Sequence, residues 1–342
     1  MSRWLRPLLV LTGLAVVGYL VVQIGPAAIW SSFVTLGWRL PLVLAFPYAL
    51  AALVDAVAWW ILLPGPVSVR LLLRARLAGE AVNLATPTMA VGGEPLKALL
   101  LRPTVPLLDG FVSVIADKTT IVAGQIVFLA AGILAARAWQ PPTGRLVAVM
   151  TSLLVVEVLA IGGFALVQAS GGLGGGGRFL GRLGARVGLG GGERYLKGLG
   201  DLDRALATLY RQGRRRLIAS ALVHAVAWAI GGLEIYIVLS LLGTPAPLLT
   251  ALIVESFAGA VKFASFMVPA SLGALEGGYV AFFEAFGLGA TAGLSYVLVR
   301  RLREITWAGI GFLVLGVSGR AAAMTAPDPP PARPAAGERG LC

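Results

Sequence analysis

The sequence predicts an all-α, polytopic membrane protein. Of its 342 residues, 58% are apolar and 13% are charged, which is about half the charged share of a soluble domain. The mean hydropathy is +0.86, and apolar runs of about 20 residues, the length of a helical span, recur along the chain. We expect six to eight transmembrane helices in one membrane domain over 1–319, and a proline-rich, disordered tail over 320–342.

Six apolar runs are expected to cross the membrane. The first, 5–24, follows two arginines but lacks a small-residue cleavage site, so it is interpreted as a span and not as a signal peptide. Loop 25–39 carries Trp30 and Trp38 as interfacial anchors. Segment 68–82 interleaves arginines with leucines, which favours a helix lying in the membrane interface. The remaining spans are expected at 40–63, 110–136, 146–168, 217–242 and 290–317.

Two further apolar segments are interrupted by proline and glycine. One covers 83–101, and the other follows the apolar run 248–268 and reads VPASLGALEGGYVAFFEAFG. Irregular backbone at membrane depth is tolerated only inside protein or beside water. Both segments are therefore expected to be re-entrant half-helices that meet near a common cavity. If the broken pieces instead cross in pairs, the number of spans rises to eight.

Basic residues indicate which ends of the spans face the cytoplasm. Arginines precede the first run, follow the second, and fill the glycine-rich loop 170–216, which holds nine Arg and one Lys. The positive-inside rule places the N-terminus, this loop and the C-terminus in the cytoplasm of a bacterial inner membrane. Because this topology explains the formal charge of +12, no nucleic acid is expected as a partner.

Acidic residues are unusually common inside the apolar stretches. A charge at the bilayer centre costs about 2.5 to 3.5 kcal/mol on insertion scales, so these residues need ionic partners or a water-filled cavity. Salt bridges between helices are the plainer interpretation for several of them. Glu94 and Glu276 differ, because each stands seven residues after a proline in a broken segment. The nine residues are Asp55, Glu94, Asp117, Glu157, Glu234, Glu255, Glu276, Glu284 and Glu304.

Basic residues in the same regions supply countercharges. Lys97 follows Glu94 by one helical turn, so the two share a helix face. Asp117 and Lys118 are adjacent in the third run, and Arg300 opens a basic cluster in the last helix. Since Arg binds phosphate through two parallel hydrogen bonds, an anionic headgroup site is expected. The alternative for the Arg300 cluster is a cytoplasmic helix end.

Enzymatic chemistry has little support in the sequence. His224 is the only histidine and Cys342 the only cysteine, so neither a Cys-based metal cluster nor a Ser-His-Asp triad without His224 can form. The glycine-rich runs 171–177 and 188–193 do not make a Walker motif. No catalytic activity, metal or cofactor is expected.

Two short segments suggest an internal duplication. VDAVAW at 54–59 is similar to VHAVAW at 223–228, while the two P-x6-E elements repeat at a different offset. With three spans in each half, the second half would begin from the opposite side of the membrane. That arrangement is the inverted repeat found in many transporters.

Three motifs resemble the lysylphosphatidylglycerol synthase transmembrane family, also called flippase-like: ATPTMAVGGEPLKALLL (85–101), SVIADKTTIVAGQ (113–125) and VPASLGALEGGYVAFFEAFGL (268–288). The likeness extends over 5–317 and implies lipid translocation. It directs attention to Asn83, Pro87, Gly92, Gly93, Glu94, Gly273 and Glu276. The charges Lys97, Asp117, Lys118 and Arg300 complete the expected substrate-binding set.

The resemblance also sets the expected partners. Larger members carry a soluble synthase domain after the membrane part, whereas this chain ends soon after Gly319, so lysyl-lipid synthesis is not expected. GGEPLKA and ADKT are similar to the branch associated with hopanoid biosynthesis. A phospholipid or hopanoid-like lipid is the expected substrate, with lipid-synthesis or lipid-export proteins as partners. Two alternatives stay open: a transporter of a small polar solute, and a scaffold that recruits lipid-synthesis enzymes.

Overall fold

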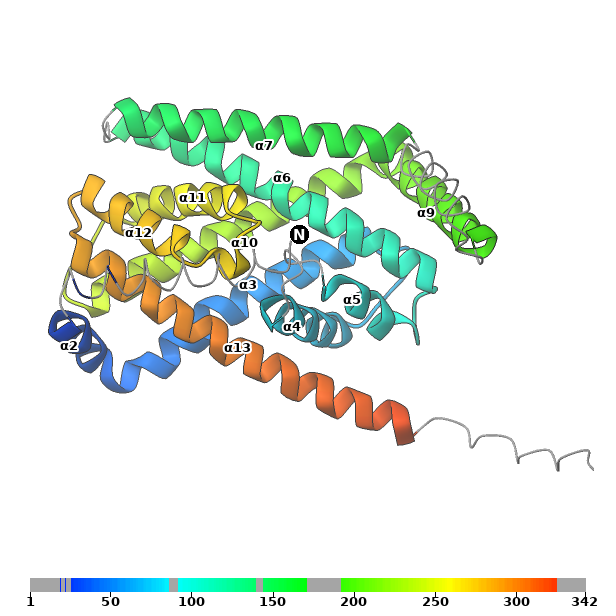
Figure 1. The fold of residues 1–342 in the computed structure, drawn as a ribbon, viewed down its shortest axis with the longest axis horizontal. Coiled ribbons are helices and arrows are strands. Elements are labelled where there is room, and N and C mark those ends of the chain that lie inside the picture. The colour runs from blue at the N-terminus through cyan, green and yellow to red at the C-terminus, as the bar shows by residue number, and fades with distance from the viewer. Residues whose placement is uncertain are drawn as a thin grey trace, which may run out of the picture.

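Long helices run along the longest axis of the molecule (Figure 1). The computed structural model describes Tyr19, Val22 and residues 26–85, 92–139, 144–170 and 192–324, and the regular elements in these ranges are all helices. The long ones are α3 (Leu40–Leu62), α6 (Leu107–Trp139), α7 (Gly144–Ser170), α10 (Arg214–Leu241) and α13 (Ala290–Met324). They match five of the expected spans. The expected first span lies almost wholly outside the described residues.

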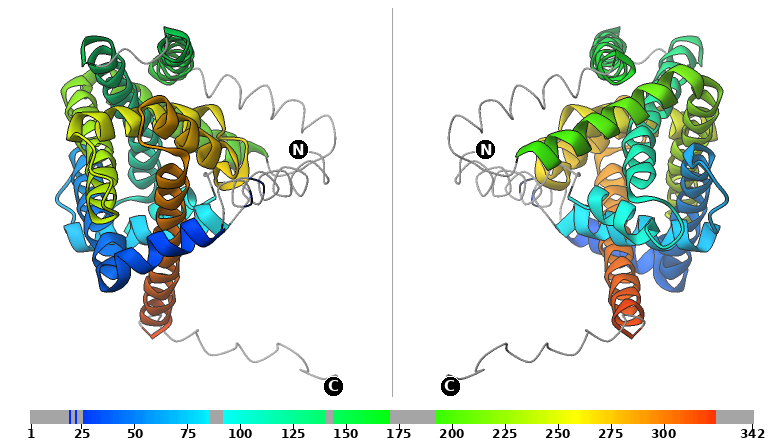
Figure 2. Two further views of the ribbon diagram at one scale, coloured as in Figure 1. Left: turned by 90° about the vertical axis from the view of Figure 1, so that its left-hand side faces the viewer. Right: turned by 90° about the vertical axis from the view of Figure 1, so that its right-hand side faces the viewer.

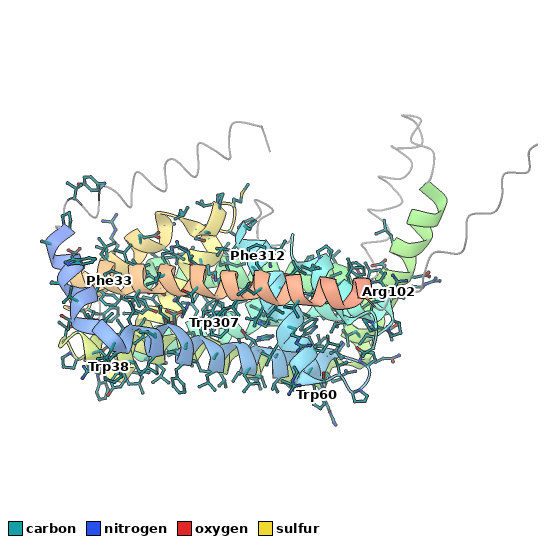
Figure 3. The ribbon with its side chains drawn as sticks, turned by 90° about the horizontal axis from the view of Figure 1, so that it is seen from below. Phe33, Trp38, Trp60, Arg102, Trp307 and Phe312 are labelled. Carbon is teal, nitrogen blue, oxygen red and sulfur yellow. The ribbon has the colours of Figure 1, made fainter. Side chains whose placement is uncertain are left out.

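The surface of the bundle fits a membrane and not water. Phe33–Leu62, α6, α7 and α10 are each long and apolar enough to cross a bilayer. Viewed along the long axis, α7 lies at the edge of the bundle (Figure 2), and its exposed side chains include Val156, Leu159 and Leu166. Trp38 and Trp60 mark opposite ends of the α3 region (Figure 3) and are exposed, as interfacial anchors are.

Two helical hairpins are too short to cross. The first consists of α4 (Val69–Ala85) and α5 (Glu94–Leu101), and the second of α11 (Leu248–Ala264) and α12 (Ala274–Ala285). At 1.5 Å per residue, α11 and α12 extend only about 25 and 18 Å, against about 30 Å of hydrocarbon. The two hairpins enter the bundle from opposite ends (Figure 1). The sequence prediction of two re-entrant elements is confirmed in this sense.

Glycine permits the tight geometry of both hairpins. In the first, a Cβ atom on Gly93 would lie 1.9 Å from the carbonyl oxygen of Gly79, so α4 and the turn before α5 touch backbone to backbone. In the second, the turn contains the 3-10 segment η2 (Pro269–Ser271). Its backbone reaches φ values of 51° at Ala270, 53° at Ser271 and 79° at Gly273. Left-handed conformations at two residues with side chains indicate local strain.

The two halves repeat one order of elements: a long helix, two half-helices and a second long helix. This order describes α3 to α6 and again α10 to α13. Arg216, at the start of α10, donates hydrogen bonds to the carbonyl oxygens of Ile61 and Leu63 at the end of α3. His224, later in α10 than Arg216, contacts Asp55, which is earlier in α3 than Ile61. Helices α3 and α10 are therefore antiparallel. Together with the opposed directions of α6 and α13 (Figure 1), this is the pattern of an inverted repeat.

Several sequence expectations need correction. The expected loop 25–39 is helical, as α2 (Pro26–Leu36) and the 3-10 segment η1 (Gly37–Arg39). The expected interfacial helix is α4, but it packs against α13 and α5, and it buries Arg76 while Arg70 and Arg74 remain exposed. An ion pair explains this, because Arg76 meets Asp55 inside the bundle.

The expected flexible loop is partly helical as well. Its second half forms α9 (Gly192–Gln212), with the apolar residues on one face. Leu206 is fully buried where α9 contacts α6, α7 and α10, and burial of that face holds the helix in place. At the other end of the chain, α13 continues past the expected boundary at Gly319 to Met324. Residues 171–191 and 325–342 lie outside the described part.

Candidate functional site

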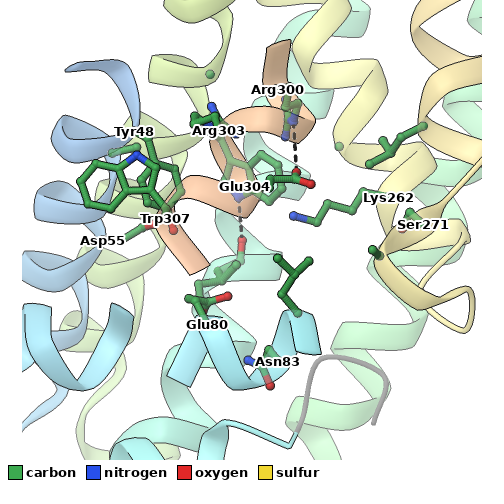
Figure 4. Close-up of a pocket in the computed structure, with 18 of the residues that line it drawn as sticks. Tyr48, Asp55, Glu80, Asn83, Lys262, Ser271, Arg300, Arg303, Glu304 and Trp307 are labelled. Carbon is green, nitrogen blue, oxygen red and sulfur yellow. Dashed lines mark hydrogen bonds and ion pairs between the residues drawn. The ribbon is translucent and has the colours of Figure 1, made fainter. Parts of the chain in front are cut away.

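The tips of the two hairpins line one cavity of about 440 Å³. Asn83 and Leu84, near the end of α4, come from the first hairpin, and Phe266 to Ser271 come from the turn of the second. Helices α3, α6, α10 and α13, together with other residues of α4, α11 and α12, supply the remaining wall. Figure 4 shows Lys262 of α11 and Glu304 of α13 pointing into this space. The cavity therefore lies where the repeated elements converge.

Glu94 is the centre of a polar group at the first hairpin. Its Oε1 atom accepts hydrogen bonds from Asn83 Nδ2 at 2.9 Å and from Lys97 Nζ at 3.3 Å, and it lies 2.8 Å from Lys118 Nζ. Asn83 Oδ1 accepts the N–H of Gly93 at 2.7 Å. Asn83 thus joins the end of α4 to the start of α5, and Glu94 joins both to α6.

Glu276 occupies the corresponding place in the second hairpin. Its Oε2 atom accepts the N–H of Gly273 at 2.7 Å and caps α12. Its Oε1 atom accepts a hydrogen bond from Arg301 Nε of α13 at 2.7 Å. Glu94 and Glu276 therefore each lie in the first turn of a half-helix and bind a cation on the long helix that follows.

Two further carboxylates hold arginines of α13 in the bundle. Glu255 of α11 accepts hydrogen bonds from Arg300 at 2.8 and 2.9 Å and from the Tyr279 hydroxyl at 2.6 Å. Glu234 of α10 pairs with Arg303. A buried charge stripped of its partner is costly, so these pairs fix α13 against α10 and α11. They also explain how so many charges are accommodated among apolar helices.

Lys118 and Lys262 are the cations of the wall that remain most accessible. The Lys118 side chain is 34% exposed although it meets Glu94. Lys262 is exposed, and within the described part of the chain no carboxylate lies at ion-pair distance from it. Its ammonium instead lies 6.0 Å from the centre of the Trp228 ring. Both lysines can bind an anionic group that enters the cavity from outside the protein.

The structure brings most of the expected binding residues together. Asn83, Lys118 and Arg300 line the cavity. Gly93, Glu94, Lys97 and Glu276 lie one contact behind it, as support for the lining residues, and Gly273 in turn contacts Glu276. Gly92 is in the turn before α5, and Pro87 lies outside the described residues.

The pairing expected between Asp117 and Lys118 is wrong. Lys118 turns to Glu94, whereas Asp117 meets His224 Nε2 at 3.0 Å and Arg76 at 3.7 Å. Neighbours in a helix point about 100° apart, so adjacency in sequence does not bring their charges together. The local pair expected between Glu94 and Lys97 is confirmed at 3.3 Å.

The binding set predicted from the sequence leaves out several residues of the site. Glu80 binds Lys97 at 2.9 Å, and Lys262, Arg301 and Glu304 line the cavity. Each had a detectable signal, because each is a charge within or beside an apolar stretch. Their partners could not be chosen without the fold, since those partners lie on other helices.

Fold and site together define a polytopic membrane protein with two opposed half-membrane hairpins and a charged internal cavity. The model of one family, the lysylphosphatidylglycerol synthase TM region, matches residues 4–311. The chain belongs to this family, which indicates a lipid-related role in the membrane. No curated protein and no solved structure matches the chain.

Proposed function

We propose that this protein moves a membrane lipid between leaflets, with the polar headgroup in the cavity and the hydrophobic tails in the bilayer. The observation that supports this most directly is the cavity itself, which combines accessible cations with an apolar wall. Lys118 and Lys262 offer positive charge, while Phe266 and Met267 at the hairpin tip are 57% and 45% exposed. A phospholipid or hopanoid-like lipid matches this cavity, because it joins a polar headgroup to a hydrophobic part.

The arginines of α13 add hydrogen-bonding capacity to the same wall. Among the described residues, no acceptor reaches Arg301 Nη2 or Arg303 Nε, although both atoms are buried. Buried donors are normally satisfied. Arginine N–H groups bind phosphate oxygens with charge-assisted hydrogen bonds, so an anionic headgroup suits them. A small polar solute would use the same charges but has no need of the exposed apolar tip.

The orientation belongs to the same proposal. Arg70, Arg74, Arg102 and the run Arg214–Arg216 gather at the end where the first hairpin enters, and we place this end in the cytoplasm of a bacterial inner membrane. The N- and C-termini would then be cytoplasmic. Lipid-synthesis or lipid-export proteins are the partners that would supply or remove the lipid.

The direct test is lipid movement in proteoliposomes. A fluorescent short-chain phosphatidylglycerol is placed in both leaflets, and bleaching from outside reports whether the inner pool becomes accessible. Glu94→Gln keeps the side-chain volume but removes the charge that orders Lys118. We expect its rate to fall about tenfold or more, the effect of losing one charge-assisted hydrogen bond of roughly 1.5 kcal/mol or more.

Glu157→Gln is the matched control. Glu157 is a fully buried carboxylate on α7 that does not line the cavity, so deleting its charge reports the general effect of such a change. Its rate should stay within about twofold of the parent. Equal rates in the parent, both variants and protein-free vesicles would refute lipid transport. Uptake of a polar solute without lipid movement would favour the alternative transporter.

A further inference from the structure

A second group of charged side chains lies beside the cavity and contributes to its wall. We name it the histidine cluster, and it comprises Asp55 of α3, Arg76 of α4, Asp117 of α6 and His224 of α10. His224 Nδ1 lies 2.7 Å from Asp55 Oδ1, and its Nε2 lies 3.0 Å from Asp117 Oδ1. Arg76 lies 2.7 Å from Asp55 Oδ2 and 3.7 Å from Asp117 Oδ2. Arg76 and His224 therefore each contact both carboxylates.

These contacts require a bound proton. Ionised carboxylates accept hydrogen bonds but cannot donate them, and a neutral imidazole has only one N–H. Both ring nitrogens of His224 face a carboxylate oxygen. A neutral ring can donate in only one of these contacts, so the other contact needs one more proton, on the ring or on an aspartate. Whichever group carries it, the proton belongs to the cluster as a unit.

Charge balance leads to the same requirement. Without the extra proton, two carboxylates oppose one guanidinium, which leaves a net negative charge inside a helical bundle, where unpaired charge is costly. The neighbouring charges do not remove this imbalance, because Glu80 is paired with Lys97 and Arg303 with Glu234. The ionisable groups that face the cluster from the helices around it are Tyr48 of α3, Glu80 of α4 and Lys97 of α5. Arg303 of α13 lies behind them, over the Tyr48 ring.

Asp55 and Arg76 are the members of the cluster that line the cavity, and Asp55 is the one of them that can carry a proton to His224. The His224 side chain is 0% exposed and the Asp117 side chain 2%, whereas the Asp55 side chain is 20% exposed and lines the cavity. Figure 4 shows Asp55 at the edge of that space. A proton can therefore reach the buried imidazole through Asp55 from whichever side of the membrane the cavity communicates with.

We propose that the histidine cluster is a proton-binding site that exchanges one proton with the cavity during lipid movement, so that a proton gradient drives transport. This inference rests on the proposed function. The proton enters from solvent in the cavity at Asp55, is shared with His224 and Asp117, and returns to solvent by the same route. No other bond is made or broken.

The position of Arg76 couples the proton to the hairpin. Arg76 stands two helical turns before Asn83 on α4, and Asn83 holds Glu94 and Gly93 at the cavity. When the proton leaves, the two carboxylates compete for Arg76 as their remaining cation. The favoured position of α4 then changes, and the change reaches Lys118 through Asn83 and Glu94.

The protonation state can be measured without any transport assay. His224 is the only histidine, so ¹⁵N-histidine labelling of the full chain in nanodiscs, with a tag that lacks histidine, gives the signals of one ring. We expect both nitrogens to be protonated or strongly hydrogen-bonded at neutral pH, and one of them to become free in Asp55→Asn. The proposal is overturned if the ¹⁵N signals show a neutral ring in a single tautomer and do not change with pH or in Asp55→Asn.

The coupling is tested in proteoliposomes that carry fluorescent phosphatidylglycerol and an imposed pH gradient. We expect the gradient to bias lipid movement in the parent and to have no effect in His224→Gln, with Asp55→Asn as a second variant should the first fail to fold. Parent protein that moves lipid equally with and without the gradient overturns proton coupling and leaves the proposed function standing. Parent protein that moves no lipid overturns both.

Discussion

The fold requires a residue without a side chain at position 93. The turn before α5 approaches α4 so closely that a Cβ atom on Gly93 would overlap the backbone of Gly79, and Asn83 fixes the approach by accepting the Gly93 N–H. Glu94 follows immediately, so the position of the signature carboxylate depends on this contact. A methyl group at residue 93 has no free space beside Gly79.

Gly93→Ala is therefore expected to destabilise the protein by about 1 to 3 kcal/mol, the usual cost of forcing extra volume into a packed site. Thermal unfolding in detergent measures the loss as a lower midpoint. Gly162→Ala on α7 is the control, because a Cβ there meets nothing within 4 Å. The packing argument fails if both variants unfold at the temperature of the parent.

Ala270 offers a second test at the residue scale. Its φ of 51° costs a residue with a side chain about 1 to 2 kcal/mol relative to glycine. Ala270→Gly is expected to leave the unfolding midpoint unchanged or raise it, whereas Ala270→Val, with a branched side chain, is expected to lower it. Equal midpoints for the glycine and valine variants would show that the turn is not strained.

At the scale of elements, the two hairpins enter from opposite ends, and this sets which loops face which side. The α5–α6 loop contains Thr104, and the α10–α11 loop contains Thr244; both residues are exposed. Since arginines gather near the first loop, we assign Thr104 to the cytoplasm and Thr244 to the outer side.

Cysteine labelling tests this assignment. In a Cys342→Ser background, an impermeant thiol reagent added to intact spheroplasts is expected to label Thr244→Cys and to spare Thr104→Cys until the membrane is permeabilised. The reverse pattern would invert the topology. Labelling of both residues from the same side would exclude the opposed hairpins altogether.

The elements also show how far sequence reasoning extends. Apolar length alone predicted α3, α6, α7 and α10 to within a few residues, and proline with glycine predicted the breaks in both hairpins. Helix α2 was missed because Trp30, like the nearby Trp38, resembled an anchor in a loop. Helix α9 was missed because the glycines and arginines around it suggested flexibility, although one of its faces is apolar.

For the whole molecule, the most informative feature of the sequence was the similarity of VDAVAW to VHAVAW. The matched positions Asp55 and His224 are in direct contact, where antiparallel α3 and α10 cross. The two signature glutamates likewise each bind a cation on the next long helix. Sequence could not predict which cation, because Lys118 and Asp117 are neighbours in the chain yet face different partners.

The central claim is that the cavity between the hairpin tips carries the lipid headgroup, and blocking it is the most direct test. In a Cys342→Ser background, Met267→Cys places a thiol at the tip, and Leu159→Cys places one on the outer face of α7, where Leu159 is 69% exposed. Each variant is reconstituted, treated with a bulky methanethiosulfonate, and assayed for phosphatidylglycerol movement before and after reduction. We predict that modification at 267 stops lipid movement reversibly and that modification at 159 does not. Full movement with residue 267 quantitatively modified would contradict the claim.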